Sequence, residues 1–299
     1  MHDSIAVAMS GGVDSSVAAW LLRQQGEQAV GVTMRLFVPE DLAPGQREQC
    51  HILEDLQDAR TVAGQLGIPH HTLDLSGLFR EQVMEPFVQA YEQGRTPNPC
   101  VTCNRTIKFG ALLEVAGQLG CGRLATGHYA RTERDTGSGR VLLKRAVHPE
   151  KDQSYVLWSL SQAQLERVCF PLGGLSKEEI RAIAEEQGLV SARRRDSQDI
   201  CFVPDGDYAA FLCHHTGRTY SPGPFCDPEG RVLGVHEGII HYTVGQRRGL
   251  KVSSNQGRLY VKELCPQENR VILSDNQALF HRGLTGKELN LIPTERLDR

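Results

Sequence analysis

Short apolar runs alternate with amphipathic stretches along the first two-thirds of the chain. The apolar runs predict buried strands at residues 5–9, 29–34, 70–75 and 123–127. Apolar positions at helical spacing predict helices at residues 15–25, 53–66, 78–91 and 104–119. Strands that alternate with helices are typical of a parallel sheet with helices on both faces. We therefore predict an α/β domain with a doubly wound parallel sheet.

The pattern changes near residue 205. Before it, Ser176 and Glu179 predict a capping box that begins a helix over residues 176–187. After it, Gly, Pro and short alternating runs at residues 238–242, 259–262 and 270–273 predict strands. We therefore divide the chain into an α/β domain at 1–204, a small mainly β domain at 205–283, and a final segment at 284–299. Its last stretch, residues 289–299, is too short to form a core.

The first strand runs directly into the sequence SGGVDSS at residues 10–16. Gly11 and Gly12 allow the backbone to approach an anion closely, and the following helix adds its N–H groups and dipole. No lysine follows the glycines, so the pattern is not that of a P-loop. Because ligands bind beyond the carboxyl ends of parallel strands, Gly11, Met34 and Gly127 are expected to converge there. The sequence thus predicts a pyrophosphate-binding turn, with Asp14 as a contributor to a magnesium site.

Composition limits the class of protein. The 299 residues are 40% hydrophobic and 23% charged, as in ordinary soluble globular proteins. No apolar run approaches the roughly 20 residues of a membrane helix, and the N-terminus lacks a leader pattern. We therefore expect a cytoplasmic protein without a membrane partner. The formal net charge of −3 means that any RNA contact must come from local basic patches.

Nine cysteines in such a chain indicate catalysis or metal binding rather than structural disulfides. Cys100 and Cys103 form a C-x-x-C pair ahead of a predicted helix, whose N-terminus is expected to lower the pKa of a nearby thiol. Such a pair fits a redox dithiol, half of a zinc site, or ligands to an iron–sulfur cluster. A second zinc-ligand pair is missing, and the pair does not follow a first strand as a thioredoxin motif would. Cys201 lies about 100 residues further along.

Six motifs, in order, carry a family resemblance: SGGVDSS, TPNPCVTCNRTIKF, TGHYAR, KDQSYVLW, DSQDICFV and GVHEGIIHYTVGQRRGL. The first resembles the PP-loop of ATP pyrophosphatases, and the set resembles the tRNA-specific 2-thiouridylases. The resemblance implies a PP-loop fold and an ATP-dependent tRNA-uridine 2-sulfurtransferase. Members are longer and end in a β-barrel, so we expect residues 284–299 to be the start of a truncated C-terminal barrel.

The resemblance also implies a reaction. ATP, with Mg²⁺, adenylates the 2-carbonyl oxygen of the wobble uridine in the tRNA anticodon stem-loop. A persulfide, supplied by a sulfur-relay protein or a cysteine desulfurase, then gives 2-thiouridine, AMP and pyrophosphate. Cys103 matches the nucleophile and Cys201 the persulfide intermediate, which implies a transient Cys103–Cys201 disulfide.

Binding residues are carried over in the same way. The ATP-binding set is Ala8, Met9, Ser10, Gly11, Gly12, Val13, Asp14, Ser15, Met34 and Gly127. The residues expected at the tRNA or its target base are Asn98, Pro99, Cys100, His128, Lys151, Asp152 and Gln153.

One position departs from the family pattern and keeps alternatives open. Many members carry Asp where this chain has Cys100, and a thiol is a poor general base at neutral pH. Cys100, Cys103 and Cys201 together could hold three irons of a 4Fe–4S cluster, so a cluster, a persulfide and released hydrosulfide all remain as sulfur carriers. Two other classes also remain: a PP-loop synthetase that amidates or ligates a small molecule, and a non-catalytic RNA-binding or cluster-carrying protein.

Overall fold

A five-stranded parallel sheet forms the centre of the computed structural model, which describes residues 4–194, 199–252 and 257–296. The strand order is β3-β2-β1-β4-β7, and every neighbouring pair is parallel. The strands are β1 Ser4–Ala8, β2 Ala29–Arg35, β3 His70–Asp74, β4 Cys121–Thr126 and β7 Val168–Cys169. The predicted doubly wound sheet is therefore confirmed.

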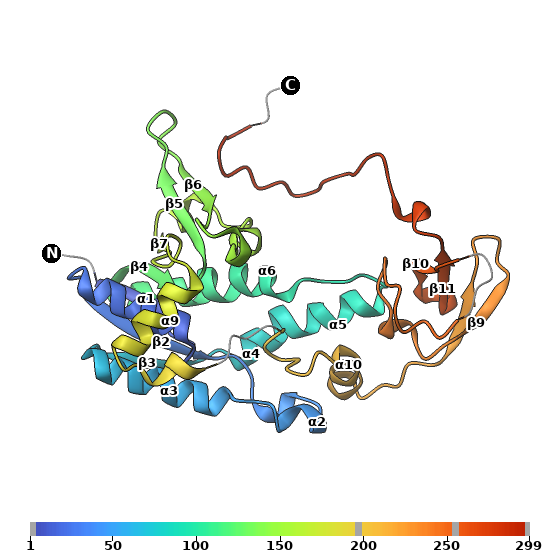
Figure 1. The fold of residues 1–299 in the computed structure, drawn as a ribbon, viewed down its shortest axis with the longest axis horizontal. Coiled ribbons are helices and arrows are strands. Elements are labelled where there is room, and N and C mark those ends of the chain that lie inside the picture. The colour runs from blue at the N-terminus through green and yellow to red at the C-terminus, as the bar shows by residue number, and fades with distance from the viewer. Residues whose placement is uncertain (1–3, 195–198, 253–256, 297–299) are drawn as a thin grey trace.

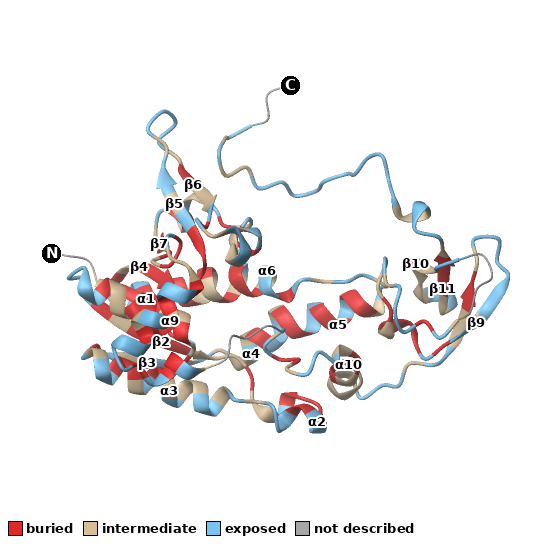
Figure 2. Cartoon of the chain, in the orientation of Figure 1, coloured by how far each residue is buried: buried red, intermediate tan, exposed pale blue. Residues whose placement is uncertain are grey.

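Helices cover both faces of this sheet (Figure 1). Ile5 and Val7 pack on one face with α1 Val13–Gln24, α3 Ile52–Leu66 and α9 Lys177–Glu186. Ala6 packs on the other face with α7 Leu112–Gln118. Because successive residues of β1 are buried on opposite faces, the strand is apolar from Ile5 to Ala8, as buried parallel strands are. Residues of this sheet and its helices are largely buried, and further buried residues lie in the downstream part of the chain (Figure 2).

Two long helices each contain a π-helical segment. The first consists of α4 Ser76–Phe79, a π segment at Arg80–Met84, and α5 Glu85–Glu92. The second consists of α6 Pro99–Cys103, a π segment at Asn104–Ala111, and α7. The predicted start of this second helix at residue 104 is wrong, because Asn98 and Pro99 begin it earlier and place the C-x-x-C pair inside its first turns.

The downstream region contains a second sheet of order β10-β11-β8-β9. Its strands are β8 Gly223–Cys226, β9 Val232–His236, β10 Tyr260–Cys265 and β11 Arg270–Ser274, and helix α10 Tyr208–Thr216 precedes them. The predicted pairing across residues 266–269 is confirmed as an antiparallel hairpin. A strand at 238–242 was wrongly predicted: Gly238 adopts a φ of +133°, and a 3₁₀ turn follows at Ile239–His241.

The remaining α-helices and strands lie outside the two sheets. They are α2 Pro44–Arg47, the antiparallel hairpin of β5 Ala130–Arg134 and β6 Val141–Arg145, and α8 Gln162–Leu165. The chain after residue 283 runs back in extended form towards this hairpin (Figure 1), and Arg140 donates hydrogen bonds to the carbonyls of Leu291 (3.0 Å) and Ile292 (2.9 Å). None of the described helices is long and apolar enough to cross a membrane.

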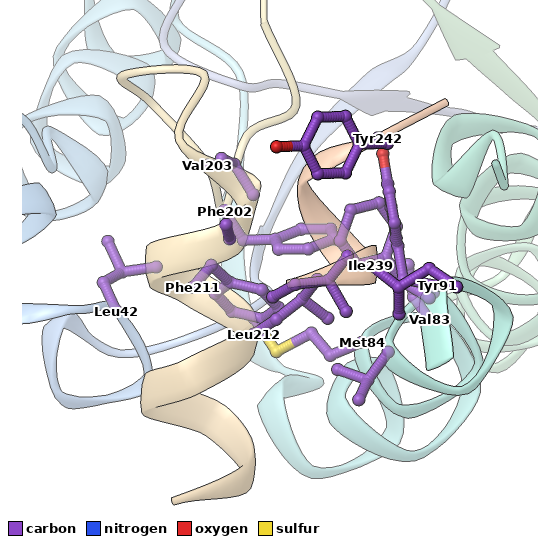
Figure 3. Close-up of a cluster of buried hydrophobic side chains, with 14 of the residues drawn as sticks. Leu42, Val83, Met84, Tyr91, Phe202, Val203, Phe211, Leu212, Ile239 and Tyr242 are labelled. Carbon is purple, nitrogen blue, oxygen red and sulfur yellow. The ribbon is translucent and has the colours of Figure 1, made fainter. Parts of the chain in front are cut away.

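A hydrophobic cluster connects the first half of the chain with the downstream region (Figure 3). Phe202 lies at its centre, edge-on to Phe79 at 5.6 Å and Phe87 at 5.3 Å, and 5.0 Å from Phe211 between ring centroids. The cluster also contains Cys103. Burial of Phe202 therefore fixes the backbone beside Cys201.

Candidate functional site

The glycine turn between β1 and α1 is held by its own serines. Ser10 N–H donates to Ser15 Oγ at 3.0 Å, and Ser15 Oγ donates to the Gly12 carbonyl at 3.1 Å. Gly11 has a φ of +77°, and a Cβ there would lie 2.3 Å from the Asp55 carbonyl oxygen on α3. No other residue type fits this position without displacing α3. The turn therefore has the rigidity that an anion-binding turn requires.

The carboxyl end of β4 meets this turn, as the sequence predicted. A Cβ on Gly127 would lie 2.9 Å from Ser15 N and 3.0 Å from Asp14 C, so Gly127 lies directly against the first turn of α1. Met34 lies on β2 two residues beyond Val32, the register partner of Ala8. Its side chain is half-buried and packs against two hydrophobic clusters. The predicted nucleotide residues are thus brought to one edge of the sheet.

Asp14 has partners that the sequence did not indicate. Lys177 Nζ donates to Asp14 Oδ1 at 2.6 Å, and Tyr129 OH donates to the same oxygen at 2.7 Å. The Lys177 side chain is 8% exposed and lies at the start of α9, where Ser176 and Glu179 form the predicted capping box. The capping box located this helix, but no pattern in the sequence placed Lys177 beside Asp14, about 160 residues away.

The surroundings of Asp14 bear on the predicted magnesium site. Asp14 Oδ1 already accepts two hydrogen bonds. In the described ranges, no three His, Cys, Asp or Glu side chains are grouped so that they could hold a metal ion. The residues present therefore do not form a protein cage for Mg²⁺, nor a three-cysteine cradle for an iron–sulfur cluster.

Residues 151–153 are tied to the nucleotide turn through Tyr129. Gln153 Oε1 accepts a hydrogen bond from Tyr129 N–H at 3.0 Å, and Gln153 N–H donates to the Tyr129 carbonyl at 2.8 Å. Burial tends to raise the pKa of Asp152, but hydrogen bonds from Ala146 N–H and from Ser154 outweigh it and lower the pKa. The hydrogen bonds of Asp152 and Gln153 hold this loop in place, and the neighbouring Lys151 is half-buried. A tRNA contact at this segment stays a prediction.

The C-x-x-C pair lies in the first turns of α6. Asn98 Oδ1 accepts a hydrogen bond from Cys100 N–H at 3.1 Å and caps the helix, and Pro99 occupies its first position. Cys100 is exposed, whereas Cys103 points into the hydrophobic cluster and is buried. The two cysteines of the pair therefore face different environments.

Cys201 comes close enough to this pair for its thiol to interact electrostatically with Cys103 and Cys100. Residues 195–198, which include the first three residues of the DSQDICFV motif, lie outside the described residues. Although Cys201 is exposed as a residue, protein atoms crowd its thiol, and desolvation raises its pKa to about 12. Burial also raises the pKa of Cys103. The expected lowering of a thiol pKa is therefore not found at Cys103, where desolvation outweighs the nearby charge of Lys108 and raises the pKa.

His128 is a buried neighbour of Gly127, the glycine that lies against the nucleotide turn. It follows Gly127, is 8% exposed, and shares a 2.7 Å hydrogen bond between its Nδ1 and Thr126 Oγ1. Burial and the nearby charge of Lys108 lower its pKa well below the usual value. Lys108 also interacts with Cys103 and Cys201. The charge of Lys108 therefore acts on His128 and on both thiols. His128 itself is packed rather than presented to solvent, and its tRNA contact stays a prediction.

A parallel sheet with a glycine turn at the N-terminus of α1 defines this chain as an α/β protein of the PP-loop class. A family model described as the tRNA methyl transferase HUP domain matches residues 3–205, and one described as the tRNA methyl transferase PRC-barrel domain matches residues 209–275. The curated relatives are named more specifically, and they show that the chain belongs to the MnmA family of tRNA-specific 2-thiouridylases.

Two relatives illustrate the similarity. The tRNA-specific 2-thiouridylase MnmA 2 of Thermoanaerobacter sp. (strain X514) is 48% identical over 300 residues, with 100% of this chain and 82% of the relative covered. The MnmA of Clostridioides difficile (strain 630) is 43% identical over 298 residues, with the same coverage. Among solved structures, the NMN synthetase from Francisella tularensis has a TM-score of 0.40 at 15% identity over 74% of this chain and 79% of its own, which adds nothing to the assignment.

Proposed function

We propose that this protein is a tRNA-uridine 2-sulfurtransferase that uses ATP and a cysteine persulfide to convert the wobble uridine to 2-thiouridine. The observation that carries the proposal is that Cys201 lies close enough to Cys103 for the two thiols to interact electrostatically, in a chain whose Gly127 lies against the glycine turn. Activation of an oxygen and delivery of sulfur need an ATP site and two thiols within reach of one another, and this site supports both.

ATP is proposed to bind at the glycine turn. The turn from Ala8 to Ser15 would take the phosphates, with Met34 and Gly127 beside the nucleoside. Mg²⁺ commonly binds through substrate phosphates with only one or two protein carboxylates, so it would arrive with the nucleotide rather than occupy a site of its own. Lys177, ion-paired with Asp14, keeps positive charge next to the turn.

The tRNA is proposed to present its anticodon loop to the exposed side of α6. Asn98, Pro99 and Cys100 lie at the first turn of this helix, and Cys100 is exposed. The segment of Lys151, Asp152 and Gln153 supports the same site through Tyr129. The target base would have to leave its stack to reach the thiols, as single-stranded loop bases can.

The proposed chemistry has four steps. The uridine 2-oxygen attacks the α-phosphate of ATP, and pyrophosphate leaves. The terminal sulfur of a Cys201 persulfide then attacks C2, and AMP leaves with the oxygen. The Cys103 thiolate attacks Cys201 Sγ, which forms a Cys103–Cys201 disulfide and releases the sulfur on C2 as the thiocarbonyl. An external thiol reduces the disulfide before the next turnover.

The sulfur donor is proposed to be a persulfide-bearing protein, either a relay protein or a cysteine desulfurase, and the reaction is placed in the cytoplasm with its tRNA substrate. All nine cysteines are free thiols, so Cys103 and Cys201 are available for the persulfide and disulfide steps. The arrangement of Cys100, Cys103 and Cys201 does not fit a preformed cluster site.

The test is a reconstitution with ATP, Mg²⁺, a persulfide donor and unmodified tRNA, followed by nucleoside mass spectrometry. Exchange of oxygen for sulfur and addition of a methyl group change the mass of uridine by different amounts. The mass of the product nucleoside therefore distinguishes thiolation from methylation. Dependence on both ATP and the persulfide donor would support the proposal. A methylated nucleoside, or turnover of ATP with ammonia and no tRNA, would contradict it.

A further inference from the structure

Lys108 lies in the π-helical segment that follows the C-x-x-C pair. In this segment each backbone N–H bonds to the carbonyl five residues earlier instead of four, as Leu112 N–H does to the Ile107 carbonyl. Five residues then complete roughly one turn, which brings Lys108 towards the face of Cys103. In an α-helix the same spacing would turn the two side chains well apart. The π segment therefore places Lys108 towards the side of the helix that carries Cys103.

The ammonium group of Lys108 has no anionic partner among the described residues. The side chain is half-buried, and it forms no hydrogen bond or ion pair with any residue in the described ranges. Its charge lowers the pKa values of Cys103, Cys201 and His128. Cys100 acts on the same two thiols in the opposite direction and raises their pKa values. A half-buried cation without an anionic partner is poised to receive an anion.

Lys108 stabilises anionic sulfur. Its charge lowers the pKa values of the Cys103 and Cys201 thiols, whereas desolvation raises them. His128 is held neutral by burial and by the same lysine, so it does not compete as a second cation. The other cation nearby in sequence, Arg105, is exposed. Lys108 is thus distinguished from its neighbours on the same segment by both position and environment.

We propose that Lys108 is a positioning residue for sulfur transfer, whose ammonium group holds the anionic sulfur of Cys103 and of the Cys201 persulfide next to the activated base. This inference rests on the proposed function. Lys108 takes no part in the bond changes. Negative charge moves from the persulfide to the departing AMP, and then from the Cys103 thiolate to the sulfur on C2, while Lys108 offsets it at each stage. No further reagent is required.

The experiment compares Lys108→Met and Lys108→Arg with Arg105→Met, which removes a positive charge from the exposed side of the same segment. Two readouts are taken on the full chain. One is the rate of 2-thiouridine formation alongside tRNA-dependent pyrophosphate release. The other is the pH dependence of iodoacetamide labelling at Cys103 and Cys201, read by peptide mass spectrometry.

For Lys108→Met we expect at least about a tenfold loss of thiolation and a labelling profile moved to higher pH, with pyrophosphate release retained. Lys108→Arg should recover most of the rate, and Arg105→Met should behave as the parent. An unchanged labelling profile and rate in Lys108→Met would overturn the inference. If that variant does not fold, Lys108→Gln replaces it with the same two readouts and the same expectations.

Failure of the proposed function has a different outcome. If the parent protein makes no 2-thiouridine yet Lys108→Met still moves the labelling profile, the electrostatic role stands and the sulfur-transfer proposal falls.

Discussion

Gly11 is the residue at which the fold depends most directly on the absence of a side chain. Its backbone φ of +77° disfavours any L side chain, and a Cβ would also overlap the Asp55 carbonyl at 2.3 Å. Gly26 separates these two effects, because its φ is +80° and a Cβ added there would have no atom within 4 Å. The pair therefore distinguishes backbone strain from steric overlap between helix and turn.

We expect Gly26→Ala to lower the free energy of unfolding by about 1 kcal/mol, from strain alone. Gly11→Ala should cost about 1–3 kcal/mol more, because α3 or the turn must move. Urea denaturation of the two variants measures the difference. Equal losses would show that the Asp55 contact does not constrain the turn.

His128 predicts a dependence of stability on pH. Its pKa in the folded protein lies well below the unfolded value of 6.5, because burial disfavours the charged ring. The unfolded chain therefore binds the proton more readily, so the stability from neutral His128 is present above pH 6.5 and is lost as the pH falls. Between pH 7.5 and 5.5 the parent should lose about 1 kcal/mol more than His128→Asn. Parallel denaturation at the two pH values tests this, and identical losses would contradict the assigned burial.

Helices α1 and α9 meet at the Asp14–Lys177 ion pair, and this contact shows where sequence reasoning reached its limit. Periodicity and the capping box located both helices, since these patterns are local. The pairing depends on how distant helices dock on the sheet, which no local pattern encodes. The π segment after Cys103 was missed for a related reason: the apolar spacing reads as an α-helix, and tertiary packing decides where an extra residue is inserted.

We expect Lys177→Met to lower the free energy of unfolding by about 1–3 kcal/mol, because Asp14 loses a charged partner at a mostly buried contact. Pyrophosphate release should fall as well if the turn loses its arrangement. The matched control is Lys144→Met, which breaks an exposed ion pair with Glu133 and should change stability by less than about 0.5 kcal/mol. Equal effects of the two changes would contradict a structural role for the α1–α9 pair.

At the scale of the whole molecule, one hydrophobic cluster contains residues on both sides of the predicted boundary at 204/205, from Phe79 and Phe87 to Phe211 and Phe225. Sequence composition marked a change of architecture there but could not show that the two parts share a core. The division into domains stays a prediction. Phe202 in this shared core positions Cys201, so docking of the downstream region contributes to the thiol site.

The central claim is that Cys103 and Cys201 transfer sulfur to tRNA activated at the glycine turn. The measurement that tests it most directly is 2-thiouridine formation by the parent protein and by Cys103→Ser, Cys201→Ser and Cys265→Ser, with ATP, Mg²⁺, a persulfide donor and unmodified tRNA. We predict thiolation by the parent and by Cys265→Ser, and none by the other two variants, although both still release pyrophosphate. Full thiolation by either Cys103→Ser or Cys201→Ser would contradict the account.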